Sequence, residues 1–286
     1  MEPFFHLAYL RGSSILSLPF STFISQMDLK EAQLTDFKVT ARHPWELARL
    51  RAVEKLLETY LTPLTKEPAK VLDIGCGDTW VIEQLTETLA EARFHAVDIA
   101  FTEEVLSHIN SKYASSRKPI RAFRSMSESL EADTGQVDLI LLLDVIEHIE
   151  DDISFLKTLH EHPGVNEHTR ILITVPAYQS LFCSHDVFLE HYRRYNNVML
   201  SEHVKAGGME PIHVGYFFTS LLLFRGVQVM KEKIFSADEA KGIGDWQGSK
   251  FKTDLMTSIL KTDYKIGAAL RKMGISLPGL SNFIIC

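Results

Sequence analysis

The apolar positions of this chain change their spacing after about residue 68. From 44 to 61 they recur at helical intervals, which predicts an amphipathic helix starting at Pro44. Beyond it, short apolar runs predict strands at 70–75, 93–98, 120–124, 137–143 and 169–175. Helical patterns lie between these strands at 80–91, 102–114 and 150–162. Strands that alternate with helices predict an α/β fold whose mostly parallel sheet is covered on both faces.

The part of the chain after the fifth strand is less regular. An aromatic and charged segment at 176–199 comes first. The patterns that follow predict a helix at 200–206, a strand at 211–218, a helix at 220–234, a loop at 236–250, a helix at 251–272 and a final strand within 275–286. We therefore expect about seven strands and four parts: an N-terminal extension (1–42), a helix and linker (43–68), a core (69–220) with a lid (176–199), and C-terminal helices with a final strand (221–286).

Two apolar stretches, 4–25 and 217–224, raise the question of membrane contact. Polar residues at 11–14 interrupt the first, and Arg225 ends the second. Neither approaches the roughly 20 residues of a membrane span, and the first lacks the basic start of a secretory signal. The second is predicted to belong to the core. For the first, a surface-packed extension, a shallow membrane-contacting segment and a true start at Met27 all stay open.

Composition narrows the function classes. The 286 residues are 45% apolar, enough for a substantial core, which excludes wholesale disorder. The 30 basic residues against 37 acidic ones give a net charge of −7, which argues against a protein that grips nucleic acid through phosphates. The three cysteines are far apart in the sequence and predict no disulfide framework, so a reducing cytoplasm is the expected compartment: Cys76, Cys183 and Cys286.

The strongest chemical signal is the turn Asp73-Ile74-Gly75-Cys76-Gly77 between the first strand and the next helix. Its glycines permit a tight turn where a parallel sheet binds ligands. A dinucleotide fingerprint would need a third glycine where Trp80 stands, and no P-loop motif occurs. Asp73 suits a cation better than a pyrophosphate, and Asp98 at the end of the second strand can accept both hydroxyls of a ribose. A ligand with a ribose and a positive charge but no phosphate is S-adenosylmethionine.

At these residues, at Asp98 and at Asp144-Val145-Ile146-Glu147-His148, the chain resembles the class I S-adenosylmethionine-dependent methyltransferases. The resemblance covers about residues 42–220. It implies a Rossmann-like sheet, a glycine loop beneath the cofactor, Asp98 on the ribose, Asp144 near the methionine moiety, and S-adenosylhomocysteine as product. The cofactor contacts expected from it along these motifs are Asp73, Gly75, Cys76, Gly77, Asp98, Ile99, Asp144 and Val145.

The chain departs from the family pattern in two places. Thr79 stands where the glycine loop usually has its third glycine, and Arg124-Ser125-Met126 replaces an acid often found after the third strand. Adenine contact would then fall to the Ser125 hydroxyl, the backbone, or Met126. Other segments look like a bacterial branch of small-molecule methyltransferases, of the type 11 and 12 kind: His43-Pro44-Trp45-Glu46, Val175-Pro176-Ala177-Tyr178, His185-Asp186 and His191-Tyr192-Arg193-Arg194-Tyr195.

Methyl transfer from a sulfonium is an in-line displacement, and a base is needed only where the acceptor must lose a proton. The candidate catalytic residues follow the fourth strand or lie in the lid: His148, His185, His191 and Tyr195. Lid residues predicted to bind substrate are Tyr178, Arg193 and Arg194. The alternative for this segment is a structural cap in which Asp186 pairs with the arginines. His185, Asp186 and His191 lack tight ligand spacing, so no metal is predicted.

The sequence thus predicts methyl transfer from S-adenosylmethionine to a small molecule, at oxygen or nitrogen rather than carbon. The apolar C-terminal additions fit a hydrophobic, aromatic or lipid-linked acceptor. Two alternatives stay open: a protein methyltransferase, and a protein that binds S-adenosylmethionine without turnover. The acidic charge and the lack of an Asn-Pro-Pro-Tyr type motif after the fourth strand argue against nucleic acid as the acceptor. Peripheral membrane contact and the oligomeric state stay open.

Overall fold

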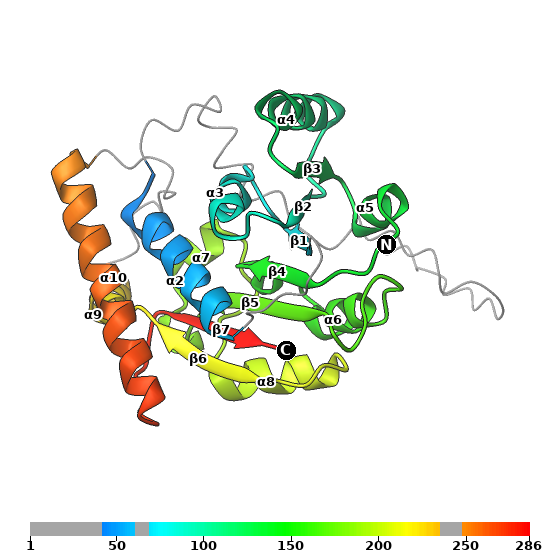
Figure 1. Cartoon of the computed structure of the whole chain (residues 1–286). Helices are drawn as coiled ribbons and strands as arrows, with labels where there is room; N and C mark the ends of the chain where they lie inside the picture. Colours follow the sequence, from blue (N-terminus) through cyan, green and yellow to red (C-terminus); the bar gives the residue numbers. More distant parts are fainter. Residues whose placement is uncertain (1–41, 61–68, 235–247) are drawn as a thin grey trace, which may run out of the picture.

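The computed structural model describes residues 42–60, 69–234 and 248–286 (Figure 1). The extension predicted at 1–42 lies outside this range except for its last residue, as do the linker at 62–68 and most of the loop predicted at 236–250. Within the described residues, no helix is both long and apolar enough to cross a membrane.

The sheet has seven strands in the order β3-β2-β1-β4-β5-β7-β6. All neighbouring pairs are parallel except the two that include β7, which is inserted antiparallel between β5 and β6. The mostly parallel sheet predicted from the sequence is therefore confirmed. The strands are β1 (Lys70–Ile74), β2 (Arg93–Val97), β3 (Ile120–Phe123), β4 (Leu139–Leu143), β5 (Arg170–Pro176), β6 (His213–Phe217) and β7 (Ser281–Ile285).

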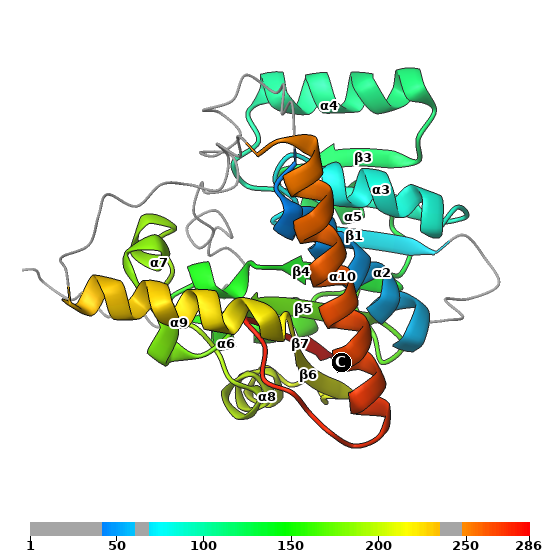
Figure 2. The ribbon, with the colours of Figure 1, turned by 90° about the vertical axis from the view of Figure 1, so that its left-hand side faces the viewer.

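Helices cover both faces of the sheet. They are α2 (Pro44–Tyr60), α3 (Trp80–Thr88), α4 (Glu103–Ser116), α5 (Met126–Ala132), α6 (Asp152–His160), α7 (Ser184–Phe188), α8 (Asn197–Ala206), α9 (Thr219–Ile234) and α10 (Lys250–Lys272), with short 3₁₀ turns η3 (Ile146–His148) and η4 (Gln179–Leu181). Apolar side chains of α2, α3, α4 and α10 pack on one face, and those of α5, α6 and α8 pack on the other. Figure 2 shows α10 lying along α2.

Strands β1 and β4 lie at the centre of the sheet and every residue in them is buried. Their near-continuous apolar sequence follows from burial on both faces, which requires apolar side chains on both sides of the strand. Because these strands run in parallel, their carboxyl ends meet at one edge, and the loops after β1, β2, β4 and β5 gather there.

Helix α7, within the segment at 176–199, was not predicted from the sequence, and neither was α5, which starts just after β3. Its start is fixed by reciprocal capping: Ser125 Oγ accepts from the amide of Glu128, and the Glu128 carboxylate accepts from the amide of Arg124. Helix α8 begins three residues before its predicted start because the Asn196 side chain caps it by accepting from the Met199 amide. The division at residue 220 stays a prediction, and β7 lies in the same sheet as the core.

Candidate active site

The turn after β1 is a left-handed glycine loop, Gly75–Thr79. Gly75 has φ +72° and Gly77 has φ +55°, values that favour glycine. At Gly75 an added Cβ would lie 2.7 Å from a methyl carbon of Val145, so a larger residue could not fit without displacing that side chain. The loop therefore needs glycine for its backbone conformation and for its close packing against the segment after β4.

Asp98 lies directly against this loop. Its side chain is only 7% exposed, and its carboxylate accepts from the amides of Gly77 at 3.1 Å and Ala100 at 2.9 Å. Burial raises the pKa of Asp98, and the two amide hydrogen bonds oppose that shift. The end of β2 thus holds an acidic oxygen pair beside the glycine loop, where the sequence predicts the ribose site.

Thr79, at the family's third glycine position, adopts φ +66°. A β-branched residue in this region is strained, which costs on the order of 1–3 kcal/mol. Its hydroxyl is buried and hydrogen-bonds to the hydroxyl of Tyr113 at 2.7 Å. The backbone thus keeps the conformation that glycine usually provides, and the Tyr113 contact stabilises the residue that replaces it.

The adenine contact expected of Met126 stays a prediction, which the burial of this residue disfavours. Its side chain is only 2% exposed and belongs to the core on the α5 face, so it has no surface to offer a purine ring. Ser125 caps α5, and its contact with adenine stays a prediction. The same holds for the expected donor contacts of Asp73, Cys76, Ile99 and Val145, although all four lie on the loops that surround Gly75 and Asp98.

The start of α2 packs over the glycine loop. The Arg42 guanidinium pairs with Asp78 of the loop and with Glu46 of the helix. The same guanidinium lies 4.7 Å from the centre of the Trp80 ring, which places a cation against its face. Trp80 stands where a dinucleotide-binding motif would have its third glycine. Its ring packs against Arg42, which lies outside the sheet.

Asp144 lies at the carboxyl end of β4 with φ +58°, an uncommon conformation that aspartate tolerates better than most residues. Its carboxylate pairs with Arg49 of α2 at 3.1 Å and accepts from the hydroxyl of Thr174 at 3.1 Å. These contacts fix the carboxylate where the strand ends and where the resemblance implies the methionine moiety.

A cavity of about 270 Å³ opens beside Asp144. It lies among the start of α2, the turn η3, helices α7, α9 and α10, and the start of β7. Part of its wall is apolar, from Leu189, Leu221, Met256, Leu260 and Leu280. Its polar lining includes three of the four predicted catalytic residues: His148, His185 and His191. The structure thus brings together histidines from two separate loops.

One buried carboxylate, Asp186 of α7, organises the segment above this cavity. It is fully buried and accepts from the amide of Cys183 at 2.9 Å and from Nδ1 of His191 at 2.9 Å. It also pairs with Arg194 at 2.7 Å and Arg225 at 2.8 Å. Burial acts in the opposite direction, but the His191 hydrogen bond and the two arginines hold the pKa of Asp186 well below its usual range. Of the internal pairing expected of a structural cap, the pair of Asp186 with Arg194 is present, whereas Arg193 pairs with Asp152 instead. Opening as a lid stays a prediction.

The catalytic role predicted for Tyr195 stays a prediction, which the position of the side chain disfavours. The side chain is fully buried, and its hydroxyl donates to Asp152 at 2.6 Å and lies 3.1 Å from the carbonyl oxygen of Ile146. Burial and then the charge of Asp152 raise the pKa of Tyr195 far above its usual value. Its backbone also pairs with Ala177, so the residue anchors the lid segment to the end of β5.

The structure also places two of the predicted substrate-binding residues away from the cavity lining. Arg193 pairs with Asp152 at 2.8 Å and donates to the carbonyl of Ile149. The Tyr178 ring stacks on Tyr216 with 5.0 Å between ring centres. Substrate binding by Arg193 and Tyr178 therefore stays a prediction, which these contacts do not support. Arg194 does line the cavity, but Asp186 and the carbonyl of Ala177 occupy its guanidinium, so substrate binding by this residue stays a prediction.

Two of the cavity histidines have a pKa below that of a free imidazole. Burial, and then the neighbouring His191, lower the pKa of His148 to about 3. Burial, and then the charge of Arg225, lower the pKa of His185 to about 4. Both rings are therefore neutral near pH 7, and a conjugate acid this strong makes each a weak proton acceptor. Their roles as bases stay predictions, which this electrostatic environment disfavours.

Three charged residues of the cavity were not predicted as site residues from the sequence. Arg49 is one of several charges on the amphipathic α2, and Arg225 follows the apolar run at 217–224, so only their partners Asp144 and Asp186 show why they point into the cavity. Glu147 is fully buried and lines the cavity beside His148. A signal for Glu147 was available, because an acid next to a histidine directly after a central strand must lie at the ligand-binding edge of the sheet.

Comparison with known families identifies this arrangement. A family model described as "Methyltransferase domain" matches residues 45–214, more than half of the chain, including the glycine loop, Asp98 and Asp144. The chain belongs to this family. It is an S-adenosylmethionine-dependent methyltransferase, so the fold, the enzyme class and the cofactor predicted from the sequence are confirmed.

Solved methyltransferase structures resemble this methyltransferase at low sequence identity. Coclaurine N-methyltransferase bound to N-methylheliamine and S-adenosylhomocysteine aligns over 92% of this chain and 82% of its own, at 11% identity and a TM-score of 0.50. A S-adenosylmethionine-dependent methyltransferase from Archaeoglobus fulgidus aligns over 82% of this chain and 93% of its own, at 18% identity and a TM-score of 0.45. No curated protein matches the chain significantly. These likenesses concern the fold.

The residues of this methyltransferase fit the donor. Bound S-adenosylmethionine supplies an electrophilic methyl group on a sulfonium. A Cβ at Gly75 would fill the space against Val145 that keeps the loop open, and the buried Asp98 carboxylate is an acceptor suited to ribose hydroxyls. The acidic Asp73 and Asp144 suit a cationic ligand better than a phosphate.

Proposed function

We propose that this enzyme methylates a small molecule with an apolar body, at an oxygen or nitrogen atom. The observation that carries the proposal is the cavity beside Asp144, at about 270 Å³ close to the lower end of the usual range for small-ligand sites. It adjoins the strand end where the donor's methionine moiety is expected. A cavity of this size supports a small molecule over a folded protein or a nucleic acid as acceptor.

The lining supports the proposed acceptor chemistry. Leucine and methionine side chains from α9 and α10 form an apolar wall, and histidines and Glu147 form a polar one. An acceptor with an apolar body and one polar heteroatom would bury the first against the helices and present the second to the histidines. Leu223, Phe224 and Phe251 on the same helices are 74–78% exposed, which supports a hydrophobic or lipid-linked acceptor.

Excluding water is the main contribution that these side chains would make. The ion pair between Asp186 and Arg225 joins α7 to α9, and Arg194 joins the same carboxylate from the loop between α7 and α8. A rigid, partly apolar enclosure positions the acceptor heteroatom and removes competing water, which is how an in-line transfer gains much of its rate. Neutral His148 and His185 can accept a hydrogen bond from an acceptor hydroxyl or amine.

The test is transfer of labelled methyl groups from S-adenosylmethionine in a small-molecule extract and in the protein fraction of the same cells. We expect label in solvent-extractable small molecules. Leu221→Trp, which fills the cavity, should lower acceptor turnover at least tenfold while leaving donor binding unchanged. Met230→Trp, nine residues along α9 and 61% exposed, is the matched control. Label found only in protein, or equal activity of the two variants, would contradict the proposal.

A further inference from the structure

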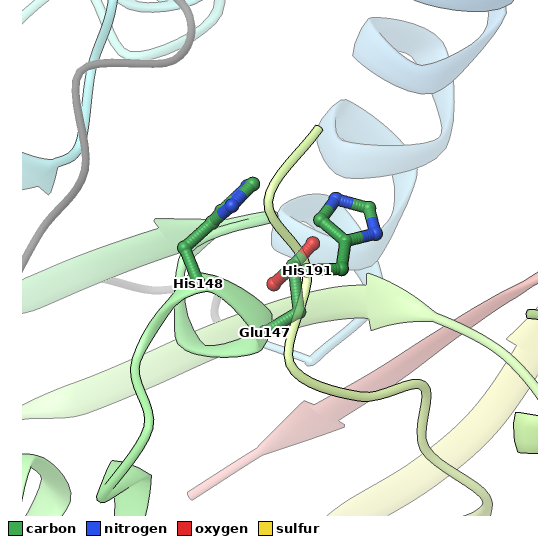
Figure 3. A group of neighbouring side chains, drawn as sticks. All are labelled: Glu147, His148 and His191. Atoms are coloured by element: carbon green, nitrogen blue, oxygen red, sulfur yellow. The ribbon is translucent and has the colours of Figure 1, made fainter. Parts of the chain in front are cut away.

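Three side chains with metal-ligating atoms meet inside the cavity. Glu147 and His148 come from the turn η3 after β4, and His191 comes from the lid segment after β5. Each offers one ligand atom, and these atoms all lie within 4.8 Å of one another. Figure 3 shows the Glu147 carboxylate beside the two imidazole rings, whose centres are 4.6 Å apart. We propose that Glu147, His148 and His191 bind a divalent transition-metal cation.

The surroundings of His191 are those of a metal ligand. Its Nδ1 hydrogen-bonds to the buried carboxylate of Asp186 at 2.9 Å, which leaves Nε2 as the atom that can face a cation. A carboxylate that holds one ring nitrogen of a ligating histidine fixes both its tautomer and its orientation. Arg194 and Arg225 fix that carboxylate in turn, so the ring is held in place before any cation binds.

His148 is held in the same way by backbone. The backbone of Leu189 and Glu190 hydrogen-bonds to its side chain, while Nδ1 is buried and has no hydrogen-bond partner among the described residues. The bonded nitrogen is therefore Nε2, and Nδ1 keeps its lone pair for another ligand. Two histidines from different loops each thus have one nitrogen fixed and one available, an arrangement that ordinary core packing does not require.

The chemistry of the three ligands limits which cations the site would bind. Two imidazoles and one carboxylate suit zinc, cobalt, iron or manganese, whereas magnesium and calcium favour sites made of oxygen. Three protein ligands leave coordination positions open, as in sites that act on a bound molecule rather than only hold the fold together. All three residues line the cavity, so an open position would face it.

This set differs from the one considered from the sequence, which combined His191 with His185 and Asp186. In the structure Asp186 orients His191 and is occupied by two arginines, so it is a positioning residue. Metal binding by these three residues requires neither the methyl donor nor the methyl acceptor. Its further role, binding an acceptor oxygen at the open position, rests on the proposed function and favours an oxygen acceptor over carbon.

The test is titration of the full-length protein, stripped with a chelator, with Co²⁺ followed by its visible absorption. We expect one equivalent to bind and to be displaced by Zn²⁺, with Mg²⁺ a poor competitor. Glu147→Gln, His148→Gln and His191→Gln should each weaken Co²⁺ binding at least tenfold and change the absorption spectrum. His185→Gln, which alters another histidine of the same cavity, should bind Co²⁺ like the wild type.

Thermal melting and S-adenosylmethionine binding show which variants are folded. Glu147 is buried, so Glu147→Gln can fail to fold. In that case His148→Gln, at a partly exposed position, provides the test. The proposal is overturned if the wild type does not bind one equivalent, if the ligand variants bind like the wild type, or if His185→Gln loses as much. Methyl transfer is measured separately, so absent metal binding with intact transfer overturns the metal site alone.

Discussion

Replacing Asp186 with asparagine tests the inference that one buried carboxylate holds the segment above the cavity. Asparagine keeps the shape of the side chain but removes its charge, and it places an amide donor where several donors already point. Arg194 and Arg225 would lose their only ionic partner among the described residues. Both are nearly buried, so water cannot replace the lost acceptor easily.

The size of the effect follows from these contacts. Removing one partner of a buried ion pair costs about 3–5 kcal/mol. Arg194 keeps the carbonyl of Ala177 and Arg225 keeps Gln228, so we expect the lower end, about 3 kcal/mol of unfolding free energy. For a protein slightly larger than 250 residues this corresponds to a fall in melting temperature of roughly 6–12 °C.

Urea and thermal unfolding of Asp186→Asn, Arg225→Gln and the double variant measure this effect. The double variant should be more stable than the sum of the two losses predicts, because the second substitution removes a cation that the first left unpaired. Glu202→Gln, an exposed acid on α8, is the control and should change stability by less than about 0.5 kcal/mol. The reasoning is refuted if Asp186→Asn resembles this control, or if the two losses simply add.

Three further predictions concern other parts of the structure. Gly75→Ala should lower the free energy of unfolding by about 2–4 kcal/mol, because residue 75 has a positive φ and its Cβ would clash with Val145. Adding Val145→Ala should restore only the part of this loss that comes from the clash. Full restoration would contradict the inference that the positive φ requires glycine. Burial, and then the charge of Lys70, lower the pKa of His95 to about 4 from 6.5, so the unfolded state takes up the proton first. Stability should fall by up to about 3 kcal/mol as the pH drops from about 6.5 to 4, and urea unfolding of His95→Gln should show a shallower loss in that window; an unchanged slope would exclude His95 as the cause. Tyr195→Phe should lower stability by about 1–2 kcal/mol through its lost hydrogen bond yet change kcat less than twofold, and a large loss of kcat at unchanged stability would restore a catalytic role.

The sequence predicted the sheet well because its central strands are buried on both faces. Their apolar runs have few alternative structures, and the helices between them have clear periodicity. The glycine loop and Asp98 were also predictable, since each lies directly after a strand and takes its position from that strand. The short helix α5 was missed because seven residues carry too little periodicity, although the Ser125 and Glu128 caps were visible.

The lid segment was harder to predict because its contacts come from distant parts of the chain. The sequence shows a cluster of histidines, arginines and tyrosines at 178–195, but not which of them turn inward. Tyr195 is buried against Asp152, and Arg193 pairs with the same acid, 41 residues away in the sequence. Arg225, which in the sequence only marks the end of the apolar run at 217–224, completes the Asp186 network. These choices depend on tertiary packing, which residue spacing does not encode.

The central claim is that the glycine loop and Asp98 bind S-adenosylmethionine in a functional methyltransferase. Calorimetric titration of the wild type and of Asp98→Ala with S-adenosylmethionine, S-adenosylhomocysteine and NADH tests it most directly. The account predicts micromolar binding of the first two ligands, at least a tenfold loss in Asp98→Ala, and no binding of NADH. Binding of NADH, or equal binding of S-adenosylmethionine by a folded Asp98→Ala variant, would contradict it.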